Sequence, residues 1–251
     1  MEYVDGPSVR EIIDRQFTDG FHAPVEFTSE VLFYSVQLCD ALEASHESGI
    51  IHRDIKPDNI MINTLGEVKI TDFGIVHIEE ATFTPTGAMV GTPRYMSPEQ
   101  VTGGKIDGRS DLYSVGVLLY EVLTGSPPFA SGDVSYQQVH NKPLPPREIN
   151  PLVPKEIAGI IMKYLEKDPN RRFNDAKDLK LELVRALDAL GGCNKYGSHT
   201  ATQCYDGPTD GMACQMKASL NPGPTRLPLG EFNSSASSPP SLGSENELDL
   251  D

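Results

Sequence analysis

The stretch that decides the fold is His52-Arg53-Asp54-Ile55-Lys56-Pro57-Asp58-Asn59. It sets a carboxylate, an ammonium group and a carboxamide at short, fixed offsets: Asp54, Lys56 and Asn59. An isolated aspartate after an arginine is usually half of a surface ion pair, and this is the structural alternative for Asp54. Alone, this stretch is a modest signal, and the motifs that follow it along the chain decide between the two readings.

Three further motifs follow along the chain. Asp72-Phe73-Gly74 begins thirteen residues after Asn59. Gly91-Thr92-Pro93-Arg94-Tyr95-Met96-Ser97-Pro98-Glu99 comes next, and Asp111-Leu112-Tyr113-Ser114-Val115-Gly116 comes after it. In order and spacing these motifs resemble the eukaryotic-type (Hanks-type) serine/threonine protein kinase family, and they are most similar to its bacterial members. The resemblance covers residues 1 to about 190.

The resemblance implies an α+β, protein-kinase-like fold. Residues 1–191 would form a partial kinase domain, made of the hinge and the mainly helical C-lobe with a small β-hairpin region. The N-terminal β lobe is expected to be absent, because the chain has no G-x-G-x-x-G run and no lysine before Lys56. Residues 192–251 are rich in Gly, Ser and Pro and lack periodicity, which predicts a disordered tail.

Hydrophobic spacing predicts the main helices. Apolar residues recur at helical intervals over 27–49, and Thr28 or Ser29 is the expected N-cap. The segment from Ser110 to Leu123 is almost entirely apolar, which predicts a helix buried on all sides. Two amphipathic helices are expected at 155–166 and 175–190, the second capped by Asn174 and closed by Gly191.

A hairpin is predicted immediately after the His52–Asn59 stretch. Residues 59–63 and 67–71 are rich in β-branched side chains, and Thr64-Leu65-Gly66 joins them as a turn. The hairpin is therefore expected at the edge of the site.

The resemblance also implies the chemistry of five residues. Asp54 would accept or orient the proton of the attacking hydroxyl, and Lys56 would contact the γ-phosphate and mark serine/threonine specificity. Asn59 and Asp72 would give oxygen ligands to Mg²⁺, with Asp72 as a turn-shaping residue in the alternative reading. Thr92 would hydrogen-bond Asp54 and Lys56 beside the substrate hydroxyl.

The start of the chain, Met1-Glu2-Tyr3-Val4-Asp5-Gly6, resembles the hinge that binds adenine. The carbonyl of Glu2 and the N–H of Val4 would pair with the base, and Met61 would pack beneath it. The structural alternative is a frayed terminus.

Arg53 implies regulation. In the family, an arginine at this position pairs with a phosphorylated residue of the activation segment and so orders that segment. Thr82, Thr84 and Thr86 are unranked candidates for the modification, and ordinary loop threonines are the alternative.

Five other motif residues are expected to be structural. His52 and Phe73 would belong to a buried stack that aligns the loop, with Asp111 anchoring it from the apolar helix. Glu99 would form a buried ion pair with Arg172.

Composition excludes several classes of function. The net charge of −15 disfavours nucleic acids and anionic membranes as partners. No apolar run approaches the ~20 residues of a membrane span, and no signal peptide is seen, so a cytoplasmic protein is expected. The cysteines show no close pairing and are expected to be free thiols: Cys39, Cys193, Cys204 and Cys214.

The function implied is ATP-dependent transfer of the γ-phosphate to Ser/Thr hydroxyls of protein substrates, with ATP and Mg²⁺ as cofactors. Residues 1–251 alone are expected to be inactive, since they lack the elements that grip the phosphates. The alternative is a catalytically dead kinase-like binding module or scaffold.

Overall fold

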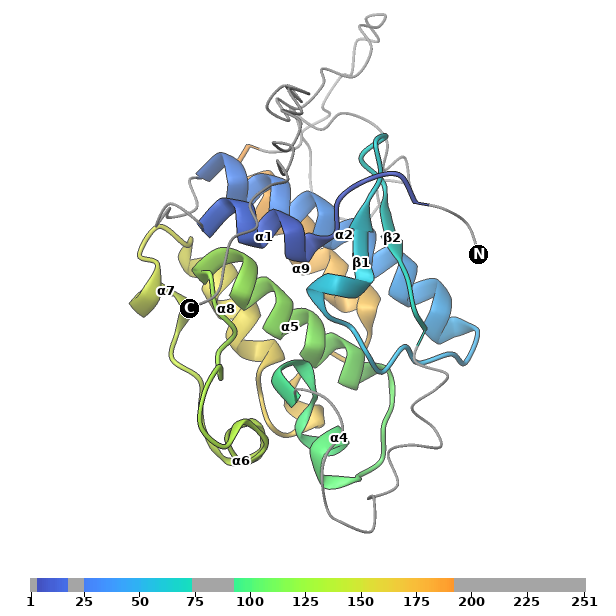
Figure 1. The fold of residues 1–251 in the computed structure, drawn as a ribbon, viewed down its shortest axis with the longest axis vertical. Helices are drawn as coiled ribbons and strands as arrows, with labels where there is room; N and C mark the ends of the chain where they lie inside the picture. The colour runs from blue at the N-terminus through green and yellow to red at the C-terminus, as the bar shows by residue number, and fades with distance from the viewer. Residues whose placement is uncertain (1–3, 18–24, 74–92, 192–251) are drawn as a thin grey trace, which may run out of the picture. The chain divides into compact units, whose positions relative to one another are not determined.

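The structure, a computed structural model, describes residues 4–17, 25–73 and 93–191, so the predicted tail, 192–251, lies outside the described ranges. Its longest elements are α2 (Val25–Glu47) and α5 (Gly108–Thr124), and Figure 1 shows α5 running among the other helices. The remaining helices are α1 (Val9–Phe17), α4 (Pro98–Thr102), α6 (Val134–His140), α7 (Pro146–Ile149), α8 (Lys155–Tyr164) and α9 (Ala176–Ala189). Three single 3₁₀ turns, η1 (Pro57–Asn59), η2 (Pro93–Tyr95) and η3 (Pro169–Arg171), and the strands β1 (Ile60–Ile62) and β2 (Val68–Ile70) complete the described part.

Helix α5 forms the centre of the core. Every residue from Ser110 to Leu123 is buried, which confirms the helix predicted to be buried on all sides. A Cβ added to Gly116 would lie 2.4 Å from the Cβ of Tyr164, so α5 and α8 cross this closely only because α5 carries a glycine there. The helix ends at Gly125, whose φ of 85° is left-handed.

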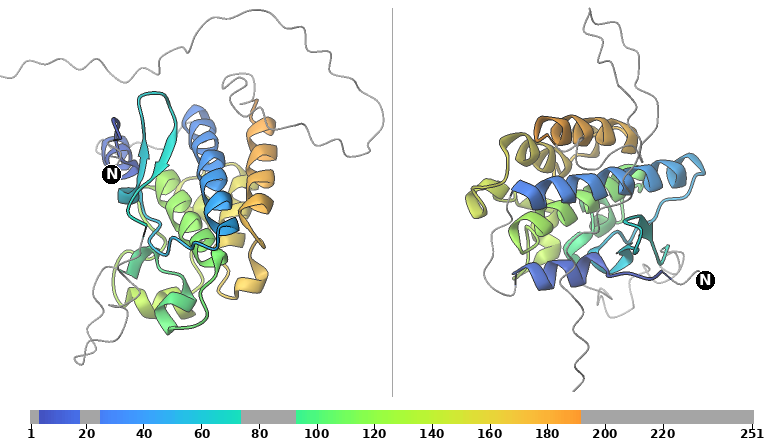
Figure 2. Two further views of the ribbon diagram at one scale, coloured as in Figure 1. Left: turned by 90° about the vertical axis from the view of Figure 1, so that its right-hand side faces the viewer. Right: turned by 90° about the horizontal axis from the view of Figure 1, so that it is seen from above.

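Helices α2 and α9 lie side by side, seen as the blue and orange helices in the left view of Figure 2. Helix α2 begins at Val25, so Thr28 and Ser29 lie inside it and are buried, and their prediction as N-caps was wrong. Asn174 was likewise wrong as the cap of α9. Asp175 takes that position, because its extended backbone lets its carboxylate accept the Asp178 N–H. No helix of the described ranges is long and apolar enough to cross a membrane.

The predicted hairpin is present as an antiparallel pair, with Met61 opposite Lys69. Asn63 closes its turn: its carbonyl accepts the Gly66 N–H, and its side-chain oxygen accepts the N–H groups of Leu65 and Glu67. The turn therefore depends on Asn63 in addition to the predicted residues 64–66.

Residues 5–8 run along the other edge of β1. The Ile62 N–H donates to the Pro7 carbonyl, and the Thr64 N–H donates to the Asp5 carbonyl. A Cβ on Gly6 would lie 1.9 Å from the Ile62 oxygen, so this approach requires a glycine. The described part of the predicted hinge is thus held by the hairpin.

Candidate active site

Asp54, Lys56 and Asn59 lie together at the start of the hairpin. The Lys56 Nζ lies 2.7 Å from the Asp54 Oδ2, and the Asn59 Nδ2 donates to the same oxygen at 2.9 Å. Both contacts fall on Oδ2, and no described residue makes a hydrogen bond to the Asp54 Oδ1. The carboxylate is about a quarter exposed, at 27%, so a hydroxyl group can reach it.

The loop that carries Asp54 is held by one buried carboxylate. Asp111 of α5 is 1% exposed and accepts the backbone N–H groups of His52 and Arg53, at 2.9 and 2.8 Å. Arg53 has a φ of 68°, a left-handed conformation that costs about 1 kcal/mol or more in a non-glycine residue. The two hydrogen bonds to Asp111 hold the loop in this conformation and confirm the predicted anchor.

The His46 side chain is a further partner of Asp111 that the sequence did not reveal. Its Nε2 donates to the Asp111 Oδ2 at 2.7 Å from the last turn of α2. The only sequence signal is that His46 ends the helix that leads into the loop.

His52 joins the loop to Asp72. It is fully buried, its Nδ1 accepts the Asp54 N–H at 3.3 Å, and its Nε2 donates to the Thr71 carbonyl at 3.0 Å. Thr71 in turn donates from its N–H to the Asn59 carbonyl at 2.9 Å. The exposed Asp72, with a φ of 54°, therefore follows a residue fastened to Asn59.

Phe73 corrects part of the predicted buried stack. Its ring lies 4.7 Å from the His52 ring, centroid to centroid, which matches the expected contact. However, 39% of its surface is exposed, so Phe73 is not buried as predicted. His52 is a buried packing residue, and Phe73 contacts its ring while remaining exposed.

Asn59 and Asp72 present the donor chemistry that Mg²⁺ prefers. The Asn59 Nδ2 is committed to Asp54, which leaves its Oδ1 toward other ligands, and Asp72 adds an exposed carboxylate. No group of three His, Cys, Asp or Glu side chains gathers as a metal site in the described ranges. Two oxygen ligands fit an ion that takes its other ligands from phosphates and water.

The predicted adenine contacts are described only in part. Val4 is half-buried, and Met61 pairs through its backbone with Ser8 beside the hinge residues. Glu2 lies outside the described residues, as do Thr82, Thr84, Thr86 and Thr92.

Arg53 has an unsatisfied donor. Its Nε is buried and has no hydrogen-bond partner among the described residues. A buried donor without a partner costs about 1–3 kcal/mol, so the position favours an acceptor from elsewhere. Its backbone carbonyl accepts from the Gln100 Nε2 at 2.7 Å, which ties α4 to the loop.

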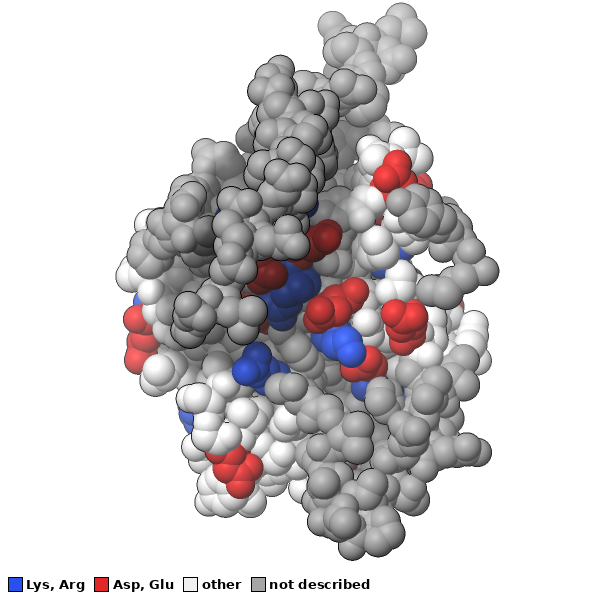
Figure 3. Space-filling view, viewed as in Figure 1, with Lys and Arg blue, Asp and Glu red and all other residues white. Residues whose placement is uncertain are grey.

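A second charged cluster that the sequence did not reveal lies beside the loop. The Arg10 guanidinium of α1 donates to the Glu121 Oε1 at 2.9 Å and to the Tyr95 hydroxyl at 2.6 Å. The Tyr95 hydroxyl in turn donates to the Glu121 carboxylate. The Arg10 Nε is also 3.9 Å from an Asp58 carboxylate oxygen. Figure 3 shows acidic and basic side chains mixed at the centre of this face.

The charges of this cluster shift its pKa values. Burial alone would lower the pKa of Arg10, but the hydrogen bond and charge of Glu121 raise it above the ordinary value. Burial and the hydrogen bond to Glu121 raise the pKa of Tyr95. The sequence signal was Glu121 itself, since a buried acid in an apolar helix needs a partner.

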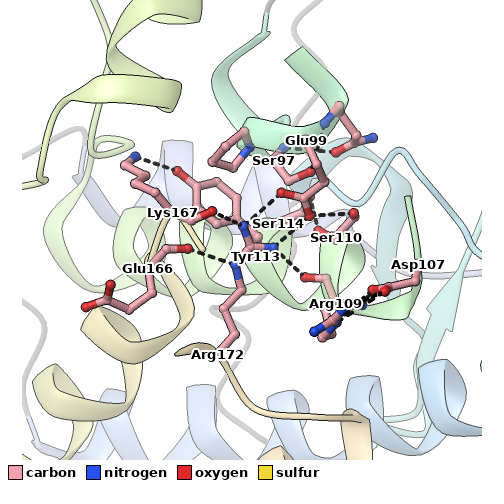
Figure 4. Close-up of polar contacts among 12 residues, drawn as sticks. Ser97, Glu99, Asp107, Arg109, Ser110, Tyr113, Ser114, Glu166, Lys167 and Arg172 are labelled. Atoms are coloured by element: carbon pink, nitrogen blue, oxygen red, sulfur yellow. Dashed lines mark hydrogen bonds and ion pairs between the residues drawn. The ribbon is translucent and has the colours of Figure 1, made fainter. Parts of the chain in front are cut away.

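The predicted ion pair of Glu99 and Arg172 is confirmed (Figure 4). The Arg172 Nη1 and Nη2 donate to the two Glu99 oxygens at 2.7 and 2.8 Å, and the Arg172 side chain is fully buried. Burial alone would raise the pKa of Glu99, but the hydrogen bonds from Arg172 and Ser110 hold it below the ordinary value. The pair joins α4 to the segment before α9.

Comparison with known proteins identifies the family. The sequence pattern described as "Protein kinase domain" matches residues 1–182. The chain belongs to the protein kinase family.

The relatives of this kinase chain include bacterial enzymes. It is 43% identical over 192 residues to the "Serine/threonine-protein kinase PknB" of Mycobacterium tuberculosis (strain ATCC 25618 / H37Rv), covering 74% of this chain and 29% of the relative. It is 42% identical over 194 residues to the "Probable serine/threonine-protein kinase SCO3848" of Streptomyces coelicolor, covering 75% and 28%. The predicted resemblance to bacterial members is confirmed, and the chain spans about 29% of the length of the PknB relative.

Among solved structures, a single-substitution mutant of the Mycobacterium tuberculosis PknI kinase domain is similar, with a TM-score of 0.56 and 25% identity. The match covers 76% of this chain and 64% of that structure. The predicted protein-kinase-like fold is therefore confirmed.

Proposed function

We propose that this chain forms the catalytic and substrate-binding part of a protein serine/threonine kinase, which transfers the γ-phosphate of ATP to Ser/Thr hydroxyls of protein substrates. The observation that carries the proposal is the Asp54 carboxylate, which Lys56 and Asn59 orient through Oδ2, with no described residue bonded to Oδ1. Names of the bacterial relatives support the same reaction.

The reaction forms a bond between the substrate oxygen and the γ-phosphorus and breaks the bond from that phosphorus to the β–γ bridging oxygen. Asp54 Oδ1 accepts or orients the hydroxyl proton, and the Lys56 ammonium, whose Nζ lies 2.7 Å from Oδ2, contacts the phosphate oxygens. Thr92 would orient the hydroxyl beside them. ADP leaves with the electron pair of the broken bond.

Asn59 and Asp72 would hold Mg²⁺, which neutralises charge on the phosphates when bound. The carbonyl of Glu2 and the N–H of Val4 would pair with adenine, with Met61 below the base. The unsatisfied Arg53 Nε supports a regulatory role, in which it binds a phosphate on Thr82, Thr84 or Thr86.

The test uses a lobe-completed protein, in which the amino-terminal lobe of the PknB relative precedes Met1. With a basic protein as phosphate acceptor, Asp54→Asn should lower kcat by about 10²–10⁴-fold and leave the KM for ATP within about twofold. Asp40→Asn, which removes a surface partner of Lys180, is the matched control. Near-normal kcat in Asp54→Asn would reject the proposal, and an inactive but substrate-binding protein would favour the scaffold alternative.

Residues 1–251 by themselves should bind Mg·ATP weakly. Two backbone hydrogen bonds to adenine contribute only about 1 kcal/mol each, while association costs about 4 kcal/mol or more. We therefore expect a millimolar Kd or weaker by calorimetry, and no detectable phosphate transfer. Micromolar binding, or transfer that Asp72→Ala abolishes, would contradict this expectation.

A further inference from the structure

Gln138 of α6 holds the backbone of residues 93–95. Its side chain is fully buried, and its Nε2 donates to the Arg94 carbonyl at 2.6 Å and to the Pro93 carbonyl at 3.3 Å. These carbonyls belong to the first described residues after the range 74–92. Helix α6 therefore fixes this backbone from a position about 44 residues away in sequence.

The Tyr113 hydroxyl of α5 fixes Gln138 in turn. It donates to the Gln138 Oε1 at 2.5 Å. With Oε1 taken by a donor, the amide group must turn its N–H groups toward the Pro93 and Arg94 carbonyls. The orientation of Gln138 thus depends on the tyrosine hydroxyl.

Lys167 completes the series, and Figure 4 shows its amine directed at the Tyr113 hydroxyl. The Lys167 Nζ donates to that hydroxyl oxygen at 3.1 Å and to the Gln137 carbonyl at 3.5 Å. Lys167 donates to the Tyr113 hydroxyl, Tyr113 donates to Gln138, and Gln138 donates to the Arg94 carbonyl, so all three bonds run in one direction. Hydrogen bonds in such a series polarise one another in a buried setting. Lys167 is thus the first donor of a one-way chain.

Lys167 is a partly buried cation with influences of both signs around it. Its Nζ lies 4.7 Å from the Phe129 ring centroid, a contact that favours the ammonium, whereas the Arg172 guanidinium, 4.8 Å from the Tyr113 ring, opposes it. Burial and the charge of Arg172 lower the pKa of Lys167 to about 8, while Glu166 raises it in part. The ammonium donates two hydrogen bonds that an apolar side chain in its place could not make.

Arg10 links residues 93–95 to the loop formed by residues 52–59. Arg10 contacts the Tyr95 hydroxyl at 2.6 Å and lies 3.9 Å from Asp58, the neighbour of Asn59. If substrate hydroxyls meet Asp54, as the proposed function states, the backbone of Pro93 and Arg94 lies on the peptide side of the site.

We propose that Lys167, Tyr113 and Gln138 form a positioning relay that fixes the Pro93–Arg94 backbone and thereby sets the affinity for the protein substrate. The proposal rests on the proposed function. None of the three side chains touches the reacting groups, so the effect should fall on peptide KM and leave kcat unchanged.

Kinetics of the lobe-completed protein provide the first test. Lys167→Met and Tyr113→Phe should each raise the peptide KM by about fivefold or more, with kcat and the KM for ATP within about twofold, as expected for the loss of one hydrogen bond. Lys167→Arg should restore the KM, and Lys163→Met, which removes a nearby cation over the Phe173 ring, is the control. The wild-type peptide KM should rise above about pH 8, whereas that of Lys167→Arg should stay flat.

The outcomes separate the two proposals. Suppose that the wild type is active. The relay would then be overturned if the peptide KM is unchanged in both Lys167→Met and Tyr113→Phe, or if these variants lose kcat as much as they gain in peptide KM. A wild type that transfers no phosphate would reject the proposed function, and the relay is then decided on residues 1–251 by hydrogen exchange. The Met96 amide, which donates to the Pro93 carbonyl at 3.2 Å, should exchange faster in Tyr113→Phe and Lys167→Met than in Lys163→Met. Equal exchange in all three would refute the relay.

Discussion

Replacing Arg172 with methionine should destabilise residues 1–251 by about 3–5 kcal/mol, because it leaves a buried carboxylate without its cation. The guanidinium makes two hydrogen bonds to Glu99 and also donates to the carbonyls of Arg109, Glu166 and Lys167. Methionine fills much of the stem volume but donates to none of these groups. Each buried acceptor left unpaired costs about 1–3 kcal/mol, so the loss belongs in the upper part of the range.

The loss should depend on pH. Glu99 has a lowered pKa in the folded protein, so its contribution to stability is present above the unfolded pKa of about 4.3 and is lost as the pH falls through the folded value. In Arg172→Met, burial instead favours the protonated acid. The difference in unfolding free energy between the two proteins should therefore be largest above about pH 5 and shrink below it.

Urea unfolding of a double-mutant cycle is the assay. Arg172→Met, Glu99→Gln and the double variant would be compared with the wild type at pH 7. The double variant should be more stable than Arg172→Met alone, since it removes the orphaned charge, and the coupling energy should exceed about 1 kcal/mol. Single effects that add within about 0.5 kcal/mol would refute the reasoning.

Three further predictions concern the stability of the same residues in urea. Gly116→Ala should destabilise the protein by about 1–3 kcal/mol, because Tyr164 leaves no room for the added Cβ. Gly159→Ala is the control and should be neutral or stabilising, because a Cβ there would have nothing within 4 Å. Equal effects of the two changes would contradict this reasoning. Tyr164→Phe should leave stability unchanged or raise it by up to about 1 kcal/mol, since its buried hydroxyl has no partner among the described residues, while Tyr113→Phe should lower it. Lys167, with its pKa lowered to about 8, disfavours folding while charged. Between about pH 8 and 10 the wild type should therefore gain on the order of 1 kcal/mol relative to Lys167→Met, after allowance for solvent screening, and a constant difference would refute the assignment.

Local patterns predicted the elements better than their ends. The buried helix from Ser110 to Leu123 and the hairpin were predicted because a continuous apolar run and a turn are signals within neighbouring residues. The caps failed because adjacent residues share the same chemistry. Asn174 and Asp175 are both good caps, and only the extended backbone of Asp175 decides between them.

The residues of the candidate site also differ in whether their contacts are local or distant in sequence. Asp54, Lys56 and Asn59 could be found from the resemblance to the kinase family, because the motif that carries it is local and their contacts lie within five residues. His46 and Arg10 could not, since their partners are 65 and 111 positions away and meet them only in the folded chain.

Polar residues on an otherwise apolar helix are a sequence signal for contacts between distant segments. A buried charge must find a partner, so Asp111 and Glu121 on α5 each imply that another segment is drawn to the helix. Asp111 accepts the N–H groups of His52 and Arg53, and Glu121 accepts from Arg10 of α1 and from the Tyr95 hydroxyl. Ten residues of helix separate the two acids by about 15 Å. Helix α5 therefore sets the spacing between the loop of residues 52–59 and residues 93–95, the two segments that a protein substrate would contact together under the proposed function.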